Sequence, residues 1–246
     1  MIVILSGEGP TDLGQCNNAQ GSCSDEQFQL GPMGLLVDQM LQLVLDYSPR
    51  TIPGVFQYIS ESVLKDRESI RKKESRKVSL VGKKRDQETG YFYINAWMLG
   101  EIALEREDTY KDKAIAILFR DCDGTRSTRA GLWIAKWKSM IDGYTRSGFV
   151  RGVPMLPKPK SEAWLLCAAK HHPYQGCDEL EELSGNDDSP NSAKKMFDTA
   201  LGGHKSAAEL CEWLENSSFD VDRASVMLSF KAFQNELGRA MNEVLY

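Results

Sequence analysis

Two apolar runs in this sequence each end abruptly in acidic residues and glycine, and they constrain the fold more than any other feature. The run at residues 2–5 leads into Glu8, which has a glycine on each side. The run at residues 114–119 leads into Asp121 and Asp123, and a glycine follows them. Short apolar runs rich in β-branched residues predict buried strands of a parallel sheet. Because ligands bind beyond the carboxyl ends of such strands, we expect these acids at one edge of the sheet.

The remaining pattern alternates between strands and helices. Strands are expected at residues 1–5, 55–63, 114–119 and 149–156. Helices are expected at residues 35–44, 91–106, 128–141, 162–170 and 223–244, with Ser161 as the N-cap of the fourth. This alternation predicts an α/β fold with a mostly parallel, Rossmann-like sheet flanked by helices. We expect the α/β domain to span residues 1–165 and a helical C-terminal part, residues 166–246, to pack on it.

Charge is distributed unevenly along the chain. The net charge is −5, yet residues 65–85 carry ten Lys or Arg against three acidic residues. A basic insertion over about residues 65–90, too polar to pack, is therefore expected to form a loop or to project. Such a patch suits a phosphate backbone as partner. The other interpretation is a solvated insertion that binds nothing.

The cysteines and the apolar runs bear on the compartment. No two of the six cysteines have the CxxC spacing of a zinc site, so free thiols in a reducing cytoplasm are expected. No apolar run approaches the roughly 18 residues that span a bilayer, so no membrane segment is expected. The first run follows Met1 without a basic segment, which argues against a secretory signal.

The acidic motifs predict a divalent-metal site. Asp121 and Asp123 repel each other when both are ionised, and a hard cation such as Mg²⁺ or Mn²⁺ relieves that repulsion. We expect Glu8, Asp121 and Asp123 to be both catalytic residues and metal ligands. Asp12 is expected as an outer ligand or a helix cap. Glu162 is expected to complete a second metal site or to interact with a helix N-terminus.

Basic residues in three segments are candidates for binding nucleic-acid phosphates. Two of these segments lie near the predicted metal site, one after the Asp pair and one after the last predicted strand. The candidates are Lys72, Lys73, Arg76, Lys77, Lys83, Lys84 and Arg85 in the insertion, then Arg126, Arg129, Lys158 and Lys160.

Together the acidic motifs resemble the TOPRIM domain of primases, topoisomerases and a family of bacterial nucleases. Residues 157–166, with the core KSEAWLL, and residues 229–233 (SFKAF) look like segments of small TOPRIM-like proteins from bacterial defence loci. The spacing from Glu8 to Asp121 is longer than in a minimal TOPRIM domain, so an insertion is required. The resemblance implies a metal-dependent nuclease that acts in anti-phage defence, with DNA or RNA, tRNA included, as substrate. The chain has no GxxxxGK[ST] motif, so coupling to ATP hydrolysis would need a protein partner such as an ATPase subunit.

Two other functions stay open. Residues 114–125 also resemble the signature of haloacid dehalogenase-like phosphatases, with Asp121 as nucleophile and Asp123 as general acid. If the chain belonged to that family, residues 185–188 of this sequence would supply the second pair of acidic residues, which binds magnesium. That interpretation leaves Glu8 without a role, and the family normally begins with this strand. The third possibility is a non-catalytic nucleic-acid-binding subunit of a larger defence complex.

Overall fold

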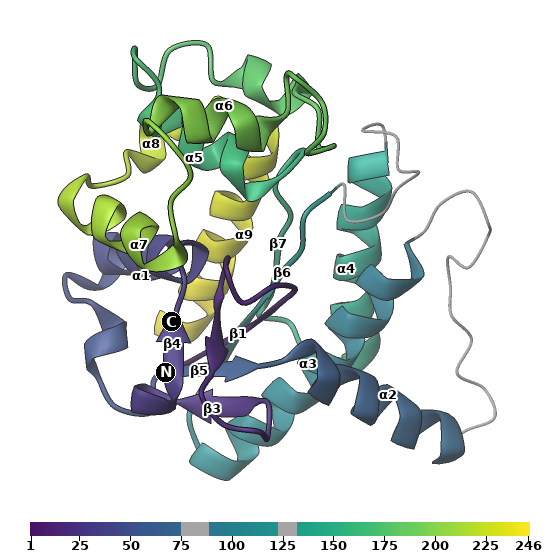
Figure 1. Ribbon diagram of the computed structural model, residues 1–246. Helices are drawn as coiled ribbons and strands as arrows, with labels where there is room; N and C mark the ends of the chain where they lie inside the picture. Colours follow the sequence, from purple (N-terminus) through teal and green to yellow (C-terminus); the bar gives the residue numbers. More distant parts are fainter. Residues whose placement is uncertain (75–88, 123–131) are drawn as a thin grey trace.

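The computed structural model describes residues 1–74, 89–122 and 132–246, and a five-stranded sheet lies at its centre (Figure 1). The strand order is β3-β5-β1-β6-β7. The strands are β1 (Ile2–Gly7), β3 (Ser22–Ser24), β5 (Phe56–Ile59), β6 (Ala114–Phe119) and β7 (Gly152–Met155). Only β3 runs antiparallel to its neighbour within this sheet. The predicted α/β fold with a mostly parallel sheet is confirmed.

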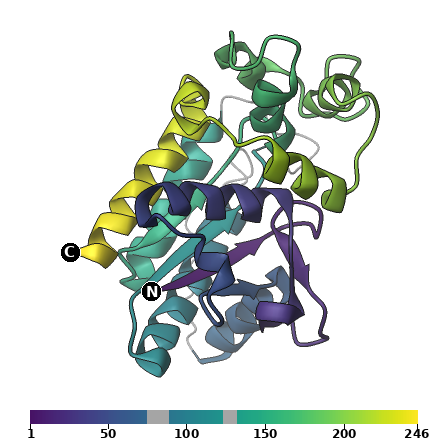
Figure 2. The ribbon, with the colours of Figure 1, turned by 90° about the vertical axis from the view of Figure 1, so that its left-hand side faces the viewer.

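Helices cover both faces of the sheet because successive strand residues point to opposite sides. Ile4 and Ala116 belong to the core beneath α3 (Gly90–Tyr110) and α4 (Trp133–Ser147). Leu5 and Ile117 belong to the core on the opposite face. That face is covered by α1 (Pro32–Leu45) and α9 (Leu228–Leu245), which lie in front of the sheet in Figure 2.

The C-terminal helices share one core with the sheet. They are α5 (Ser161–Ala169), α6 (Ala193–Ala200), α7 (Ala207–Asn216), α8 (Val221–Ala224) and α9. The ring of Trp164 lies 5.1 Å from that of Phe230 and 5.7 Å from that of Phe233. Its indole Nε1 donates a hydrogen bond to Ser229 Oγ at 2.8 Å. Ser229, Phe230 and Phe233 of the segment that carried part of the family resemblance are therefore buried, whereas Lys231 is exposed.

A small ribbon precedes α1, in a part of the chain where no strand was expected. Its strands are β2 (Gly14–Cys16) and β4 (Phe28–Leu30), and they pair antiparallel. Short 3-10 helices occupy Asp25–Gln27, Pro49–Thr51 and Asp178–Glu182. The ribbon strands have three residues each, too few for a clear alternation of polar and apolar side chains.

The basic insertion was expected to be too polar to pack and to form a loop or to project, but its described part is helical and contacts α3 through ion pairs. Residues 65–74 belong to the helix α2 (Glu61–Glu74), and the expected strand at 55–63 ends at Ile59. Arg67 pairs with Glu101 and Glu105 of α3, and Arg71 pairs with Glu101. Ion pairs one helical turn apart within α2 also stabilise the helix. Charge counting along the segment missed these acidic partners because they follow it by about thirty residues in the chain.

Two helix termini also differ from expectation. Ser161 is not an N-cap but the first residue of α5, and its hydroxyl donates to Asp12 instead. The helix expected at residues 223–244 is interrupted, since α8 ends at Ala224 and α9 begins at Leu228. Val226, in the interruption, is exposed.

The expectation of free thiols is wrong for four of the six cysteines. Disulfide bonds join Cys16 to Cys23 and Cys167 to Cys177, with Cα–Cα distances of 5.7 and 5.3 Å. The pairs are brought together by the turns between them, which the sequence spacing did not reveal. The predicted cytoplasmic location loses the support that free thiols would have given it. Among the described residues no helix is both long and apolar enough to cross a membrane.

A glycine allows α3 and α4 to pack closely. A Cβ at Gly143 would collide with the carbonyl oxygen of Tyr93 and would lie 2.8 Å from the methyl group of Ala96. A Cβ at Gly238, in α9, would meet no atom within 4 Å.

We predict opposite effects for Gly143→Ala and Gly238→Ala on stability. Gly143→Ala should lower the free energy of unfolding by about 1–3 kcal/mol through overpacking. Gly238→Ala should raise it by roughly 0.5–1 kcal/mol, because alanine loses less backbone entropy in a helix. Urea unfolding of both variants measures this, and equal effects would contradict the close helix contact.

Candidate functional site

The ends of β1 and β6 bring Glu8 and Asp121 together. The two strands are adjacent and parallel, with Gly7 opposite Phe119 in the register. Glu8 Oε1 accepts a hydrogen bond from the backbone N–H of Asp121 at 3.2 Å. Gly9 follows with a φ of +78°, a conformation that favours glycine in the turn. The predicted meeting of the two acidic motifs at one sheet edge therefore holds for these two residues.

A buried arginine fixes Glu8 in place. Arg120 follows β6 directly, and its guanidinium donates to Glu8 Oε2 at 3.0 Å and to Glu61 Oε1 at 2.8 Å. Burial opposes ionisation of Glu61, but the bonds from Arg120 and Lys65 outweigh it and lower the pKa of that carboxyl. Sequence reasoning missed Arg120. The signal was present, because a cation at the end of an apolar strand needs an acidic partner once it is buried.

The N-terminus of α5 binds Asp121 and one further carboxylate, that of Asp12. Asp121 Oδ1 accepts from the backbone N–H of Ser161 at 3.0 Å. Asp12 Oδ1 accepts from the hydroxyl of the same serine at 2.7 Å. The positive end of the helix dipole favours negative charge at this position. Ser161 therefore links the turn after β1 to the turn after β6.

The negative charge at this edge is only partly compensated. Burial, followed by the negative charge of Glu162, raises the pKa of Asp12 to about 6, although the hydrogen bond from Ser161 acts the other way. Burial also raises the pKa of Asp121 well above its ordinary value, and the charges of Asp12 and Glu162 add to this. Glu162 Oε2 is buried and accepts no hydrogen bond from the described residues. A bound cation would stabilise the ionised forms of these carboxylates.

The oxygen-only donor set fits Mg²⁺ or Mn²⁺, which prefer carboxylate ligands. Glu8 and Asp121 would hold the ion, and Asp12 and Glu162 lie beside them. Within residues 1–74, 89–122 and 132–246, however, no three acidic, His or Cys side chains already surround a common ion position. Glu8 faces Arg120, and the third predicted ligand, Asp123, lies outside the described residues.

Three of the four described basic candidates, Lys72, Lys158 and Lys160, form ion pairs. Lys158 binds Glu182 at 2.5 Å, and Lys160 binds Asp187 at 2.7 Å. Burial works against protonation of Lys160, yet the carboxylate of Asp187 and other nearby acids raise its pKa. On α2, Lys72 pairs with Glu68 and Lys73 is exposed. The other candidates lie outside the described residues: Arg76, Lys77, Lys83, Lys84, Arg85, Arg126 and Arg129.

A buried lysine also lies beside the second acidic motif. Lys136 of α4 is 1% exposed, and its ammonium donates to the carbonyl oxygen of Cys122. The same ammonium lies 5.0 Å from the centre of the Phe92 ring. Sequence reasoning placed Lys136 within a helix without a role. Its ammonium therefore lies beside Cys122, the residue that follows Asp121.

Comparison with known proteins returns no match to any family model, curated protein or solved structure. The TOPRIM resemblance therefore remains a prediction, carried by the acidic motifs and the two shorter segments.

The raised pKa of Asp12 predicts how stability changes with pH. Its carboxyl binds a proton more tightly in the folded protein, at about 6, than at its ordinary 3.8. The folded state therefore binds more protons between these values, and this group makes stability fall as pH rises from about 4 to 6. Asp12→Asn should remove that loss and stabilise the metal-free protein at pH 7 by roughly 2–3 kcal/mol.

Urea unfolding in EDTA at pH 4 and pH 7 measures the difference. Asp108→Asn is the matched control, since Asp108 is 84% exposed. A gain for Asp12→Asn that is no larger at pH 7 than at pH 4 would contradict the assignment.

Proposed function

We propose that this protein is a divalent-metal-dependent nuclease of TOPRIM type that hydrolyses nucleic-acid phosphodiesters with Mg²⁺ or Mn²⁺. The observation that carries the proposal is the meeting of Glu8 and Asp121 at the carboxyl edge of β1 and β6, among carboxylates whose charge is only partly compensated. Asp123 is the third member of the proposed set on sequence grounds alone. An effector role in anti-phage defence is part of the proposal and rests on the resemblance.

Arg120 and Ser161 would prepare the site for a bound ion. The guanidinium of Arg120 holds the Glu8 side chain at the sheet edge. The N–H of Ser161 orients Asp121. The bound ion would orient the scissile phosphate and lower the pKa of an attacking water. Glu8, flanked by glycines that allow close approach, is the candidate general base.

One observation favours the phosphatase as a second candidate. Lys160 binds Asp187, and its charge also interacts with that of Asp121. A lysine and a later acid beside the nucleophile would suit a haloacid dehalogenase-like site, with Asp121 as nucleophile. Against it, β6 lies beside β1 in the middle of the sheet, and Glu8 would then have no chemical part. We therefore rank the nuclease first.

Metal binding should be detectable without any substrate. Mg²⁺ at ten times its dissociation constant should stabilise the folded protein by about 1.4 kcal/mol. Thermal unfolding at pH 7 with EDTA or with millimolar Mg²⁺ measures the effect as a rise in Tm. Asp121→Asn should lose the rise, whereas the exposed control Asp108→Asn should keep it. A wild-type Tm that is the same in EDTA and in Mg²⁺ would contradict the proposed metal site.

Cleavage of labelled DNA, single-stranded RNA and tRNA, each with Mg²⁺, Mn²⁺ or EDTA, tests the activity. We expect metal-dependent cutting that Glu8→Gln slows at least about 100-fold, as loss of a general base does. Glu26→Gln, at an exposed position, is the matched control and should leave the rate unchanged. Unfolding curves of both variants show whether they are folded.

A small phosphomonoester assayed beside the polymers separates the alternatives. Its turnover by both the wild type and Glu8→Gln, without polymer cleavage, would favour the phosphatase. Binding of nucleic acid without turnover of any substrate would favour the non-catalytic subunit and would overturn the proposed activity of the isolated chain.

A further inference from the structure

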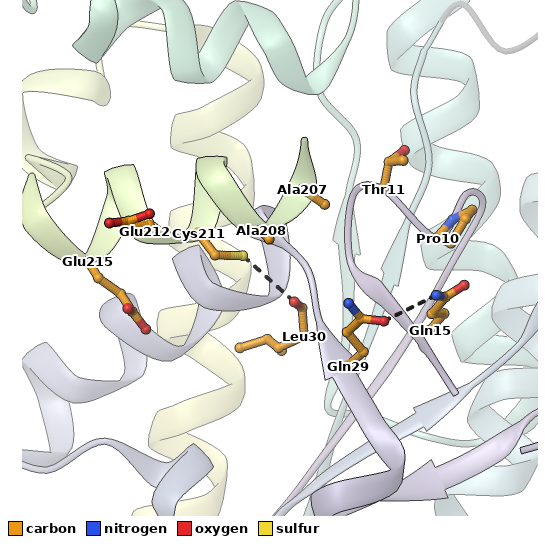
Figure 3. Close-up of a pocket in the computed structure, with 10 residues that line it drawn as sticks. All are labelled: Pro10, Thr11, Gln15, Gln29, Leu30, Ala207, Ala208, Cys211, Glu212 and Glu215. Atoms are coloured by element: carbon orange, nitrogen blue, oxygen red, sulfur yellow. Dashed lines mark hydrogen bonds between the residues drawn. The ribbon is translucent and has the colours of Figure 1, made fainter. Parts of the chain in front are cut away.

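The turn that carries Glu8 borders a cavity whose described lining contains no Lys or Arg. The cavity has a volume of about 420 Å³ and lies between the β2–β4 ribbon and α7. Figure 3 shows Pro10 and Thr11 of this turn on one side and α7, with Glu212 and Glu215, on the other. No positive charge on this side of the turn therefore offsets that of Glu8.

The positive charge next to Glu8 comes from Arg120. Among the described residues it is the one Lys or Arg that pairs with Glu8, at 3.0 Å, and the same guanidinium pairs with Glu61 at 2.8 Å. With its amide oriented as the surrounding donors and acceptors require, Asn95 Oδ1 accepts from Arg120 Nε at 3.2 Å. Arg120 and Asn95 are both buried, so solvent screens these contacts little.

One guanidinium charge is therefore shared between two carboxylates. Because Asn95 is neutral, the two carboxylates of Glu8 and Glu61 and the guanidinium of Arg120 together keep one net negative charge. Lys65 also pairs with Glu61, at 3.2 Å, but its side chain is 55% exposed, and solvent weakens such a pair. Without the charge of Glu61, the guanidinium would neutralise Glu8 and oppose the binding of a divalent cation there.

We propose that Glu61 is a positioning residue of the metal site, which binds Arg120 and so leaves enough negative charge on Glu8 to hold a divalent cation. The inference rests on the proposed metal-dependent nuclease and concerns how its affinity for the metal is set. Glu61 acts through Arg120 and does not itself bind the ion. Arg120 can then hold Glu8 at the sheet edge without neutralising it.

Isothermal titration calorimetry with Mg²⁺ alone, at pH 7 and without nucleic acid, tests the proposal. Glu61→Gln keeps an oxygen that accepts from Arg120 and removes only the charge, so it should weaken Mg²⁺ binding about tenfold. Glu101→Gln is the matched control, because Glu101 pairs with Arg67 and Arg71 of α2. It removes the same charge elsewhere on α2 and α3, and should leave the dissociation constant for Mg²⁺ unchanged.

A double-mutant cycle shows whether Glu61 acts through Arg120. Arg120→Gln should tighten Mg²⁺ binding, because the competing positive charge is lost. Adding Glu61→Gln to Arg120→Gln should then change the dissociation constant less than about twofold. An unchanged dissociation constant for Glu61→Gln alone, or an equal weakening with and without Arg120, would overturn the proposal.

Asn95→Asp provides a second test that keeps Arg120 and holds even where Arg120→Gln does not fold. In the Glu61→Gln background it gives the guanidinium a new carboxylate partner, so Mg²⁺ affinity should return to within about threefold of the wild type. Absence of this rescue would overturn the proposal. A wild-type protein that binds no Mg²⁺ would overturn the metal site itself, so the two failures are distinguishable.

Discussion

The ion pairs that the guanidinium of Arg120 forms are the interactions on which this site depends most. It joins the residue after β1 to the first residue of α2, because Glu8 and Glu61 both bind it. A buried arginine is stable only when such partners satisfy it, so the ends of three elements are fixed relative to one another. The position of Glu8, and with it the proposed chemistry, follows from this ion-pair cluster.

A second support comes from the opposite side, where α5 begins. Ser161 uses its backbone N–H for Asp121 and its hydroxyl for Asp12. Burial, followed by the charges of neighbouring carboxylates, nevertheless raises the pKa values of Asp12 and Asp121. The protein thus keeps negative charge beside the carboxyl ends of its central strands, where an α/β sheet binds ligands.

Much of the fold was predictable from the sequence because the apolar runs at residues 2–5 and 114–119 identify buried strands directly. The meeting of Glu8 and Asp121 followed from strand order. The roles of Arg120 and Ser161 were not predictable, since each depends on partners distant in the chain. The ion pairs that hold α2 against α3 were missed for the same reason. The ribbon was missed because its strands have only three residues each. Local patterns identify elements, whereas contacts between elements require the folded chain.

The placement of α9 has a consequence for how the chain is made. This helix covers β6 and β7 on one face, yet it is synthesised well over a hundred residues after β1. While the chain emerges from the ribosome, the apolar side of the central strands that carries Ile117 stays without its cover. When a C-terminal segment is needed to cover the core, the chain exposes apolar, aggregation-prone surface until that segment has been translated. Newly made copies of this protein would therefore need chaperones most before their last helix is complete.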